Sequence, residues 1–374
     1  MSKIIGVAGL GTMGLGIAQV FAQAGFDVLA TDANSQARAS AHARLRAALE
    51  PRVAKGVITE AARDDALAHL GIVDNLEALA PADLVIEAII ETLEAKRTLF
   101  ATLESVVARD AVLATNTSSL SVGAIAAGLR NPERMVGLHF FNPAPAMKLV
   151  ELIGHGGTSA EALVRARSVT EHAGKTVIAC ADRPGFIVNR CARPFYGEAL
   201  ALFEEGRTPG EIDASMLAAG YRIGPFSLID LIGADINLAA TEGLSHGMGG
   251  HPRYHVFDTL RAQAASGALG RKAGRGFIWP GEPGPLPADA VEIALRIETT
   301  LVNEACWLLA EGGVSRDGID TAMKLGLNFP RGPFETLERH GAARIVEALA
   351  ALEATAPSHL KGRYVAAPGL LSLS

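Results

Sequence analysis

The sequence predicts an α/β domain with a doubly wound parallel sheet, followed by two all-helical domains in tandem. Three observations predict this fold class. A glycine-rich turn joins a short apolar stretch to a helical pattern near the N-terminus, apolar strand-like stretches then alternate with helical ones, and beyond residue 183 helical periodicity dominates. A pattern repeated within the helical half places the domain boundaries at 1–183, 184–281 and 286–374.

Composition narrows the classes of function. The formal net charge of −6 comes without a Lys/Arg-rich block, which disfavours nucleic acid as a partner. The cysteines are odd in number and lack C-x-x-C spacing, which predicts reduced core residues; they are Cys180, Cys191 and Cys306. The sequence has no zinc-type cluster of Cys and His residues, so we expect no metal site. Since we find neither a signal peptide nor about 18 consecutive apolar residues, we expect a cytoplasmic protein that does not bind membranes.

The first element is a buried strand over residues 4–8, which leads into the turn Gly9-Leu10-Gly11-Thr12-Met13-Gly14 and then into helical spacing. In a dinucleotide-binding turn the first glycine permits the tight bend and the second lets the backbone approach a pyrophosphate. The third glycine lets the helix pack on the strand. We therefore predict that Gly9, Gly11 and Gly14 hold a dinucleotide at the helix N-terminus.

The second strand favours NAD as that dinucleotide. Residues 27–31 form an apolar stretch that ends at Asp32, about twenty residues past the glycines, where a carboxylate accepts hydrogen bonds from ribose hydroxyls. Asp32 would repel a 2'-phosphate, and Ala33-Asn34-Ser35 supplies no arginine to bind one. The alternative interpretation is a structural glycine turn followed by a solvated aspartate.

Helical and strand-like stretches then alternate. A helix is expected from Ser35 to Val53 with a stop at Lys55-Gly56, and Lys55 alone indicates only a surface lysine. Strand-like runs follow at 72–73, 83–88 and 111–115, so the domain is Rossmann-like. Ligands of such sheets bind beyond the carboxyl ends of the strands, where this sequence has Glu91, Lys96 and Asn116-Thr117-Ser118-Ser119. The last of these is also consistent with a helix cap alone.

A histidine and a glutamate follow on two further strands. Residues 134–138 lead to His139, Pro143 and Pro145 force an extended turn, and residues 148–153 return as a strand. Adjacent strands would bring Glu151 back beside His139. A histidine that meets a carboxylate is a ready proton acceptor, although a single histidine near a strand end is more often structural.

Five motifs stand at defined spacings: G-L-G-T-M-G from residue 9, N-T-S-S-L at 116–120, G-L-H-F-F-N-P at 137–143, K-L-V-E at 148–151 and D-R-P-G-F-I-V-N-R at 182–190. Ser118 lies 21 residues before His139, Glu151 lies 12 after it and Asn189 lies 50 after it. This set resembles the L-3-hydroxyacyl-CoA dehydrogenase family over nearly the whole chain.

The resemblance implies an enzyme of fatty acid metabolism with NAD as cofactor and an acyl-CoA as substrate. It implies that His139 is the general base toward the 3-hydroxyl and that Glu151 orients it. Ser118 would hydrogen-bond the substrate oxygen, and Asn189 would fix the substrate against the histidine.

The resemblance also implies contacts to the two nucleotides. Glu91, Lys96, Asn142 and Lys272 match NAD contacts of the family, although Arg271-Lys272 alone would be interpreted as a solvated loop. Lys55 stands where the family has a lysine facing coenzyme A. Seven positions earlier, Ala48 replaces the family's small polar residue, which is a departure at the coenzyme A contact.

The helical half resembles the 6-phosphogluconate-dehydrogenase-C-terminal-like domains of this family, and it contains an internal repeat. Asn303-Glu304-Ala305 echoes Gly197-Glu198-Ala199, and Arg331-Gly332-Pro333-Phe334 echoes residues 223–226. A linker rich in proline and glycine at 280–287 joins the copies. Because single-copy members of the family dimerise through this domain, the second copy is expected to replace the partner, which gives a monomer or a differently built homodimer.

The expected activity is reversible hydride transfer between NAD and the 3-hydroxyl carbon of an (S)-3-hydroxyacyl-CoA. The acyl group stays open, since 3-hydroxybutyryl-CoA and 3-hydroxyadipyl-CoA both agree with the resemblance. Two alternatives remain. One is an NAD-dependent dehydrogenase of a free hydroxy acid, similar to the gulonate dehydrogenases, and the other is a non-catalytic NAD-binding protein.

Overall fold

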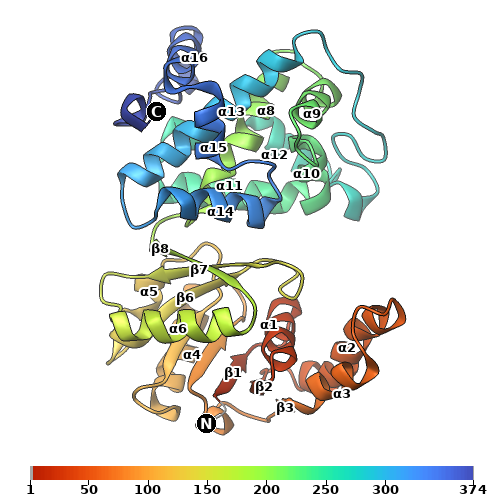
Figure 1. Cartoon of the computed structure of the whole chain (residues 1–374), viewed down its shortest axis with the longest axis vertical. Helices are drawn as coiled ribbons and strands as arrows, with labels where there is room; N and C mark the ends of the chain where they lie inside the picture. Colours follow the sequence, from red (N-terminus) through yellow and green to blue (C-terminus); the bar gives the residue numbers. More distant parts are fainter. Residues whose placement is uncertain (1–2, 374) are drawn as a thin grey trace. The chain divides into compact units, whose positions relative to one another are not determined.

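The protein folds into two compact units, Met1–Arg183 and Pro184–Ser374. The structure is a computed structural model, and it describes residues 3–373. Figure 1 traces the chain from the sheet and helices of the first unit to the helices of the second. The predicted fold class, a Rossmann-like α/β part followed by an all-helical part, is confirmed. The division into three domains stays a prediction.

An eight-stranded sheet in the order β3-β2-β1-β4-β5-β6-β7-β8 forms the centre of the first unit. Strands β1 to β6 run parallel to one another, β7 is antiparallel to β6, and β8 is parallel to β7. The chain order reverses between β1 and β4, and ligands of such sheets bind at that point. The strands are β1 Ile4–Ala8, β2 Asp27–Thr31, β3 Leu70–Ile72, β4 Leu84–Glu87, β5 Val112–Thr115, β6 Met135–Phe140, β7 Leu149–Gly154 and β8 Thr176–Ala181.

Helices connect the strands and pack on the sheet, as the lower part of Figure 1 shows. Strands β4, β5 and β6 are buried along their whole length, which explains their nearly continuous apolar sequences. The α-helices of this unit are α1 Thr12–Gln23, α2 Ser35–Ala54, α3 Glu60–Ala68, α4 Leu93–Val106, α5 Val122–Ala126 and α6 Ala160–His172.

Local structure agrees with the sequence at one helix end and differs from it elsewhere. Helix α2 ends at Ala54 with Lys55 as its C-cap and Gly56 at a φ of +67°, as the Lys55-Gly56 stop predicted. The strand expected at 72–73 is β3, which starts two residues earlier. No element was predicted for α6 or β8, although Ser159 caps α6 by accepting a hydrogen bond from the Ala162 amide at 3.1 Å.

The second unit is helical. Its described residues, 184–373, contain no strand and only one isolated bridge, between Gly270 and Arg275. Across residues 3–373, no helix is long and apolar enough to cross a bilayer. The α-helices of this unit are α7 Val188–Cys191, α8 Arg193–Glu204, α9 Pro209–Ala218, α10 Pro225–Ile232, α11 Ala234–Gly247, α12 Asp258–Ala265, α13 Ala290–Ala310, α14 Arg316–Leu327, α15 Pro333–His340 and α16 Ala342–Thr355.

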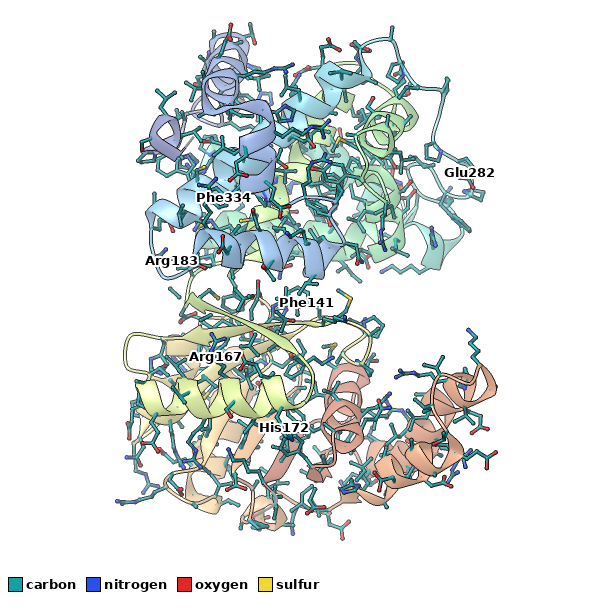
Figure 2. All side chains as sticks on the ribbon, viewed as in Figure 1. Phe141, Arg167, His172, Arg183, Glu282 and Phe334 are labelled. Carbon is teal, nitrogen blue, oxygen red and sulfur yellow. The ribbon has the colours of Figure 1, made fainter. Side chains whose placement is uncertain are left out.

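The sequence repeat within this unit has matching local structure. In the first copy, the buried Asp213 accepts hydrogen bonds from the Phe226 and Ser227 amides at the start of α10. In the second copy, Asp320 accepts hydrogen bonds from the amides of Phe334, which is labelled in Figure 2, and of Glu335. Each aspartate therefore satisfies free N–H groups in the first turn of the helix that follows it.

Arginine and glutamate side chains also form ion pairs between the two copies. Arg190 of the first copy donates to Glu304 of the second at 2.7 Å, and Arg296 of the second copy donates to Glu198 of the first at the same distance. All four side chains lie in or beside the buried contact of α8 with α13. Equivalent further partners complete the exchange: Arg190 with Glu311, Arg296 with Glu205, Arg253 and Tyr254 with Glu304, and Arg363 and Tyr364 with Glu198.

Candidate active site

The glycine turn lies where β1 ends and α1 begins. Gly9 has a φ of +104°, and a Cβ there would lie 2.5 Å from the carbonyl oxygen of Ala88, which directly follows the neighbouring strand β4. A Cβ at Gly14 would lie 1.9 Å from the carbonyl oxygen of Gly9. Both positions therefore require glycine for the fold itself.

Gly11 differs from the other two glycines of the turn. A Cβ at this position would meet no heavy atom of the described chain within 4 Å. Gly11 is also the N-cap of α1, and no side chain caps this helix. An open glycine before uncapped N–H groups suits the close approach of a pyrophosphate, so these residues fit a dinucleotide.

Asp32 follows β2 and supports the glycine turn directly. Its Oδ2 accepts a hydrogen bond from the Leu10 amide at 2.7 Å, and its Oδ1 accepts one from the Asn34 amide at 2.8 Å. Sequence reasoning missed Arg38, which donates to the main-chain carbonyl of Asp32 at 2.6 Å. This arginine reaches back from α2, one turn beyond the stretch in which an arginine had been sought.

Glu91 and Lys96 belong to one network with a glutamate that sequence reasoning missed. Lys96, only 1% exposed, lies 2.6 Å from Glu87 and 3.1 Å from Glu91. Glu87, at the end of β4, also accepts a hydrogen bond from Thr115 at 2.6 Å. Two carboxylates thus neutralise a buried ammonium, as burial of a charge requires. The sequence did contain a signal for Glu87, because it is a charged residue at the end of an otherwise apolar strand.

The same network holds the polar segment after β5. Glu91 accepts hydrogen bonds from the Thr117 hydroxyl at 2.5 Å and from the Ser118 and Ser119 amides at 2.9 and 3.2 Å. Burial raises the pKa of Glu91, but the Thr117 hydrogen bond and the Lys96 charge outweigh it, so the pKa lies below its usual value. Glu91 is therefore ionised at neutral pH and fixes Ser118 at the carboxyl edge of the sheet.

His139 and Glu151 face each other across β6 and β7. They are register partners of the antiparallel pair, and the Nδ1 of His139 lies 2.7 Å from a carboxylate oxygen of Glu151. Glu151 is fully buried and His139 is 5% exposed. The ring of Phe141, labelled in Figure 2, packs against the imidazole at 4.5 Å between centroids. When Nδ1 donates to the carboxylate, Nε2 is the nitrogen that can accept a proton.

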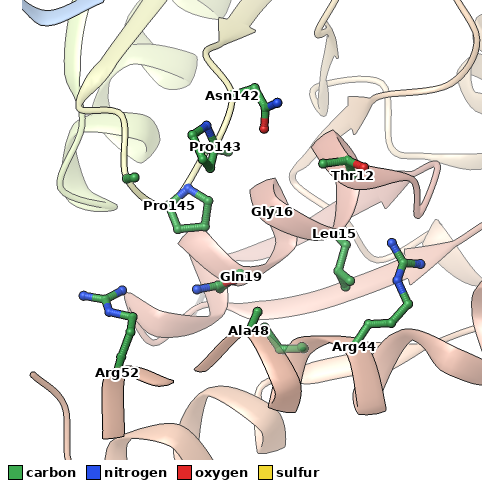
Figure 3. Close-up of a pocket in the computed structure, with 13 residues that line it drawn as sticks. Thr12, Leu15, Gly16, Gln19, Arg44, Ala48, Arg52, Asn142, Pro143 and Pro145 are labelled. Atoms are coloured by element: carbon green, nitrogen blue, oxygen red, sulfur yellow. The ribbon is translucent and has the colours of Figure 1, made fainter. Parts of the chain in front are cut away.

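Asn142 lies in the loop that joins these two strands and on the wall of a pocket. The pocket has a volume of about 600 Å³ and lies between α1, α2 and this loop, as the close-up in Figure 3 shows. Lys175 fixes the loop because its Nζ donates to the carbonyls of Ala144 and Met147 at 2.6 and 2.8 Å. Ala48 lines the pocket, whereas Lys55 caps α2 beyond it and is not among the lining residues.

Asn189 and Lys272 belong to the second unit. Asn189 lies in α7, is half-buried, and accepts a hydrogen bond from Arg193 through its main-chain carbonyl at 3.0 Å. Lys272 lies in the short helical turn Arg271–Ala273, where its Nζ is 2.7 Å from a carboxylate oxygen of Asp235. Their contacts to substrate and NAD stay predictions. Within residues 3–373, no three His, Cys, Asp or Glu side chains form a group suited to a metal ion.

Comparisons with known proteins cover both units. The sequence model described as the NAD-binding domain of 3-hydroxyacyl-CoA dehydrogenase matches residues 4–183. The model described as the C-terminal domain of the same enzyme matches residues 185–279 and again 293–370.

Individual relatives carry related names. A 3-hydroxyadipyl-CoA dehydrogenase of Escherichia coli K12 is 44% identical over 283 residues, which cover 75% of this chain and 60% of that protein. A probable 3-hydroxybutyryl-CoA dehydrogenase of Bacillus subtilis 168 is 41% identical over 277 residues, covering 74% of this chain and 96% of that protein. The crystal structure of a 3-hydroxybutyryl-CoA dehydrogenase from E. coli K12 superposes with a TM-score of 0.92 at 32% identity, covering 100% of this chain and 98% of that one.

Proposed function

The chain belongs to the 3-hydroxyacyl-CoA dehydrogenase family of NAD-dependent oxidoreductases that act on CH–OH groups, and on this premise we propose that it interconverts an (S)-3-hydroxyacyl-CoA and the 3-ketoacyl-CoA. The buried pair of His139 and Glu151, 2.7 Å apart in the unit that carries the glycine turn, is the observation that carries the proposal. A carboxylate that accepts from Nδ1 holds the imidazole ring in place and leaves Nε2 as the nitrogen that takes the proton.

The residues around the dinucleotide position divide the work of binding NAD. Gly11 and the N-terminus of α1 take the pyrophosphate, Gly9 and Gly14 shape the turn, and Asp32 takes the adenosine ribose. Glu91 and Lys96 set the carboxyl edge of β4, where the nicotinamide half would lie. Asn142 and Lys272 complete the set of NAD contacts that the family resemblance implies.

NAD supplies the hydride acceptor, and the chain supplies the proton acceptor and the orientation. His139 takes the proton of the 3-hydroxyl at Nε2 while Nδ1 keeps its hydrogen bond to Glu151. Glu151 stabilises the resulting imidazolium and holds the ring in the required tautomer. The family resemblance further implies that Ser118 hydrogen-bonds the substrate oxygen and that Asn189 contacts the substrate.

A substrate series tests this function. NADH oxidation is followed with acetoacetyl-CoA, longer 3-ketoacyl-CoAs, 3-ketoadipyl-CoA and a free keto acid. We expect turnover with at least one coenzyme A thioester, and the preferred thioester identifies the acyl group. Activity on the free acid alone would assign the chain to the free hydroxy acid dehydrogenases, and NAD binding without any turnover would make it non-catalytic.

We also propose that the protein is a monomer in the cytoplasm. The arginine and glutamate pairs between the two helical copies are satisfied within one chain, which supports a unit that needs no second protomer. Cys180, Cys191 and Cys306 are buried and form no disulfide, which supports a reducing compartment. Light scattering over a range of concentrations tests the monomer, and a mass of two chains would contradict it.

A further inference from the structure

A small cavity lies inside the helical unit, among α8, α11, α12 and the turn Pro252–Tyr254. The centre of a water molecule could occupy about 10 Å³ of it, which is space for one water molecule or one monatomic ion. Three arginines line the cavity, Arg193, Arg253 and Arg363, and none of the described residues that line it is acidic. The charged side chains on its wall are therefore all cationic.

Two of these arginines belong to the ion pairs between the helical copies. Arg253 lies 3.1 Å from Glu304, and Arg363 lies 3.1 Å from Glu198. The full set of pairs joins Arg190, Arg253, Arg296 and Arg363 to Glu198, Glu205, Glu304 and Glu311. Arginines and glutamates are equal in number in this set, so its charges balance, and Arg193 remains outside it.

Arg193 is a buried cation without a paired anion. Only 8% of it is exposed, and its guanidinium donates to neutral oxygens, among them the Asn189 carbonyl and the Thr241 hydroxyl, both at 3.0 Å. Within residues 3–373 it forms no ion pair with a carboxylate. The ring of Tyr196, whose centroid lies 4.7 Å from the guanidinium carbon, compensates the charge only in part. Burial accordingly lowers the pKa of Arg193, as expected when no anion favours the charged form.

Asn237 of α11 supplies a second, independent observation. This residue lines the same cavity and is only 2% exposed. Neither the nitrogen nor the oxygen of its side-chain amide has a hydrogen-bond partner among the residues that the structure describes. Buried amides are normally hydrogen-bonded, so an unpartnered amide on the wall of a cavity indicates that the cavity holds a polar or charged particle.

The second helical copy lacks this arrangement. Glu304 follows its counterpart Glu198 by 106 residues, and the same offset leads from Arg193 to Thr299. Helix α13 thus repeats the pattern of α8 with a threonine at this position, which shows that the helical fold does not by itself require an arginine there. The difference favours a role of Arg193 in binding over a role in the fold.

We propose that this cavity binds one chloride ion, held by the guanidinium of Arg193 and the side-chain amide nitrogen of Asn237. A monatomic anion fits the volume, supplies the negative charge that Arg193 lacks and accepts the hydrogen bond that the amide can donate. Carboxylate and phosphate groups are too large for this space, since each has several heavy atoms. A water molecule would fit but would leave the buried charge uncompensated.

Thermal unfolding of the full chain in potassium chloride and in potassium gluconate, at equal ionic strength, tests this proposal. Gluconate is too large for the cavity, whereas chloride at about five times its Kd should raise the melting temperature of the helical unit by about 2–4 °C, because it binds the folded state only. Scanning calorimetry measures the shift.

Three variants separate the site from the general effects of the two salts. Asn237→Asp places a carboxylate beside Arg193, so it should lose the chloride effect and melt in gluconate at the temperature of the wild type in chloride. Arg193→Met should also lose the effect. Arg261→Gln removes one positive charge from the surface of the same unit, where Arg261 pairs with Glu242 at 2.7 Å, and it should keep the full effect.

Crystals grown in chloride and measured at a long X-ray wavelength test the site directly, because chloride gives an anomalous difference peak and water gives none. We expect a peak in the cavity of the wild type and no peak in Asn237→Asp. Density without an anomalous peak in the wild type would identify an ordered water only and would overturn the proposal. It is also overturned if the change of salt shifts the wild type and Asn237→Asp equally, a comparison that holds even if Arg193→Met does not fold.

Discussion

His139 has two features that a general base of this kind needs. Its Nδ1 contacts a carboxylate, and the residue lies near the end of a strand. We expect His139→Gln to lower kcat by about 10²- to 10⁴-fold, the usual contribution of a positioned base, because glutamine cannot accept the proton. The Kd for NAD, measured by fluorescence titration, should change little since no NAD contact is assigned to this residue. Turnover at the wild-type rate would show that another group is the base.

The buried ammonium of Lys96 is paired with the carboxylates of Glu87 and Glu91. Lys96→Met would leave Glu87 buried without its cation, and breaking a buried pair in this way costs roughly 3–5 kcal/mol. Urea unfolding measures the loss. The double variant Glu87→Gln with Lys96→Met removes both charges, so it should recover part of the lost free energy of unfolding. A single variant as stable as the wild type would mean that water reaches Glu87.

Residues of this kind mark the limit of what the sequence could predict about the site. Adjacent strands were enough to expect Glu151 beside His139, because antiparallel register follows from the short connection. The pairing of Lys96 with Glu87 and the two carbonyls held by Lys175 depend on elements packed together in three dimensions.

At the scale of elements, the glycines of the turn meet two different requirements, one for the stability of the fold and one for the binding of NAD. Gly14→Ala should lower the stability by roughly 2 kcal/mol or more, because its Cβ would overlap the Gly9 carbonyl and part α1 from β1. Gly11→Ala should leave the melting temperature nearly unchanged, since its Cβ meets no atom of the described chain within 4 Å. It should raise the Kd for NAD about tenfold, because the Cβ would enter the space proposed for the pyrophosphate. Equal losses of stability in both variants would contradict this separation.

The caps of α10 and α15 predict how stability depends on pH. Burial raises the pKa of Asp213 to about 6, and burial also raises the pKa of its counterpart Asp320. Because the folded-state pKa of Asp213 exceeds its unfolded value of 3.8, its contribution is complete below pH 4 and is lost as pH rises toward 6, by up to about 3 kcal/mol.

The variant Asp213→Asn isolates this contribution because asparagine does not titrate. The advantage of the wild type over the variant, measured by urea unfolding between pH 4 and pH 7, should therefore shrink as pH rises. Parallel stability curves for the two proteins would rule out the titration of Asp213 as the cause.

At the scale of the whole molecule, the repeated motifs predicted that the helical pattern occurs twice. They did not predict which residues of one copy contact which residues of the other. Matching positions such as Glu198 and Glu304 were visible in the sequence. That each glutamate pairs with the arginine of the other copy follows only from the packing of α8 against α13. The exchange is the one expected of a two-fold interface, in which residue i contacts residue j and j contacts i.

This exchange predicts the behaviour of a chain shortened to residues 1–283, which keeps Arg190 and Glu198 but loses their partners Arg296 and Glu304. Two such chains can satisfy each other, because Arg190 of each can pair with Glu198 of the other at the equivalent positions. We therefore expect the full chain to be monomeric and the shortened chain to dimerise, since buried charges without partners cost several kcal/mol each. Sedimentation at several concentrations measures both masses, and Glu198→Arg in the shortened chain should abolish the dimer. A shortened chain that stays folded and monomeric at high concentration would show that the exchanged pairs do not act as an internal two-fold interface.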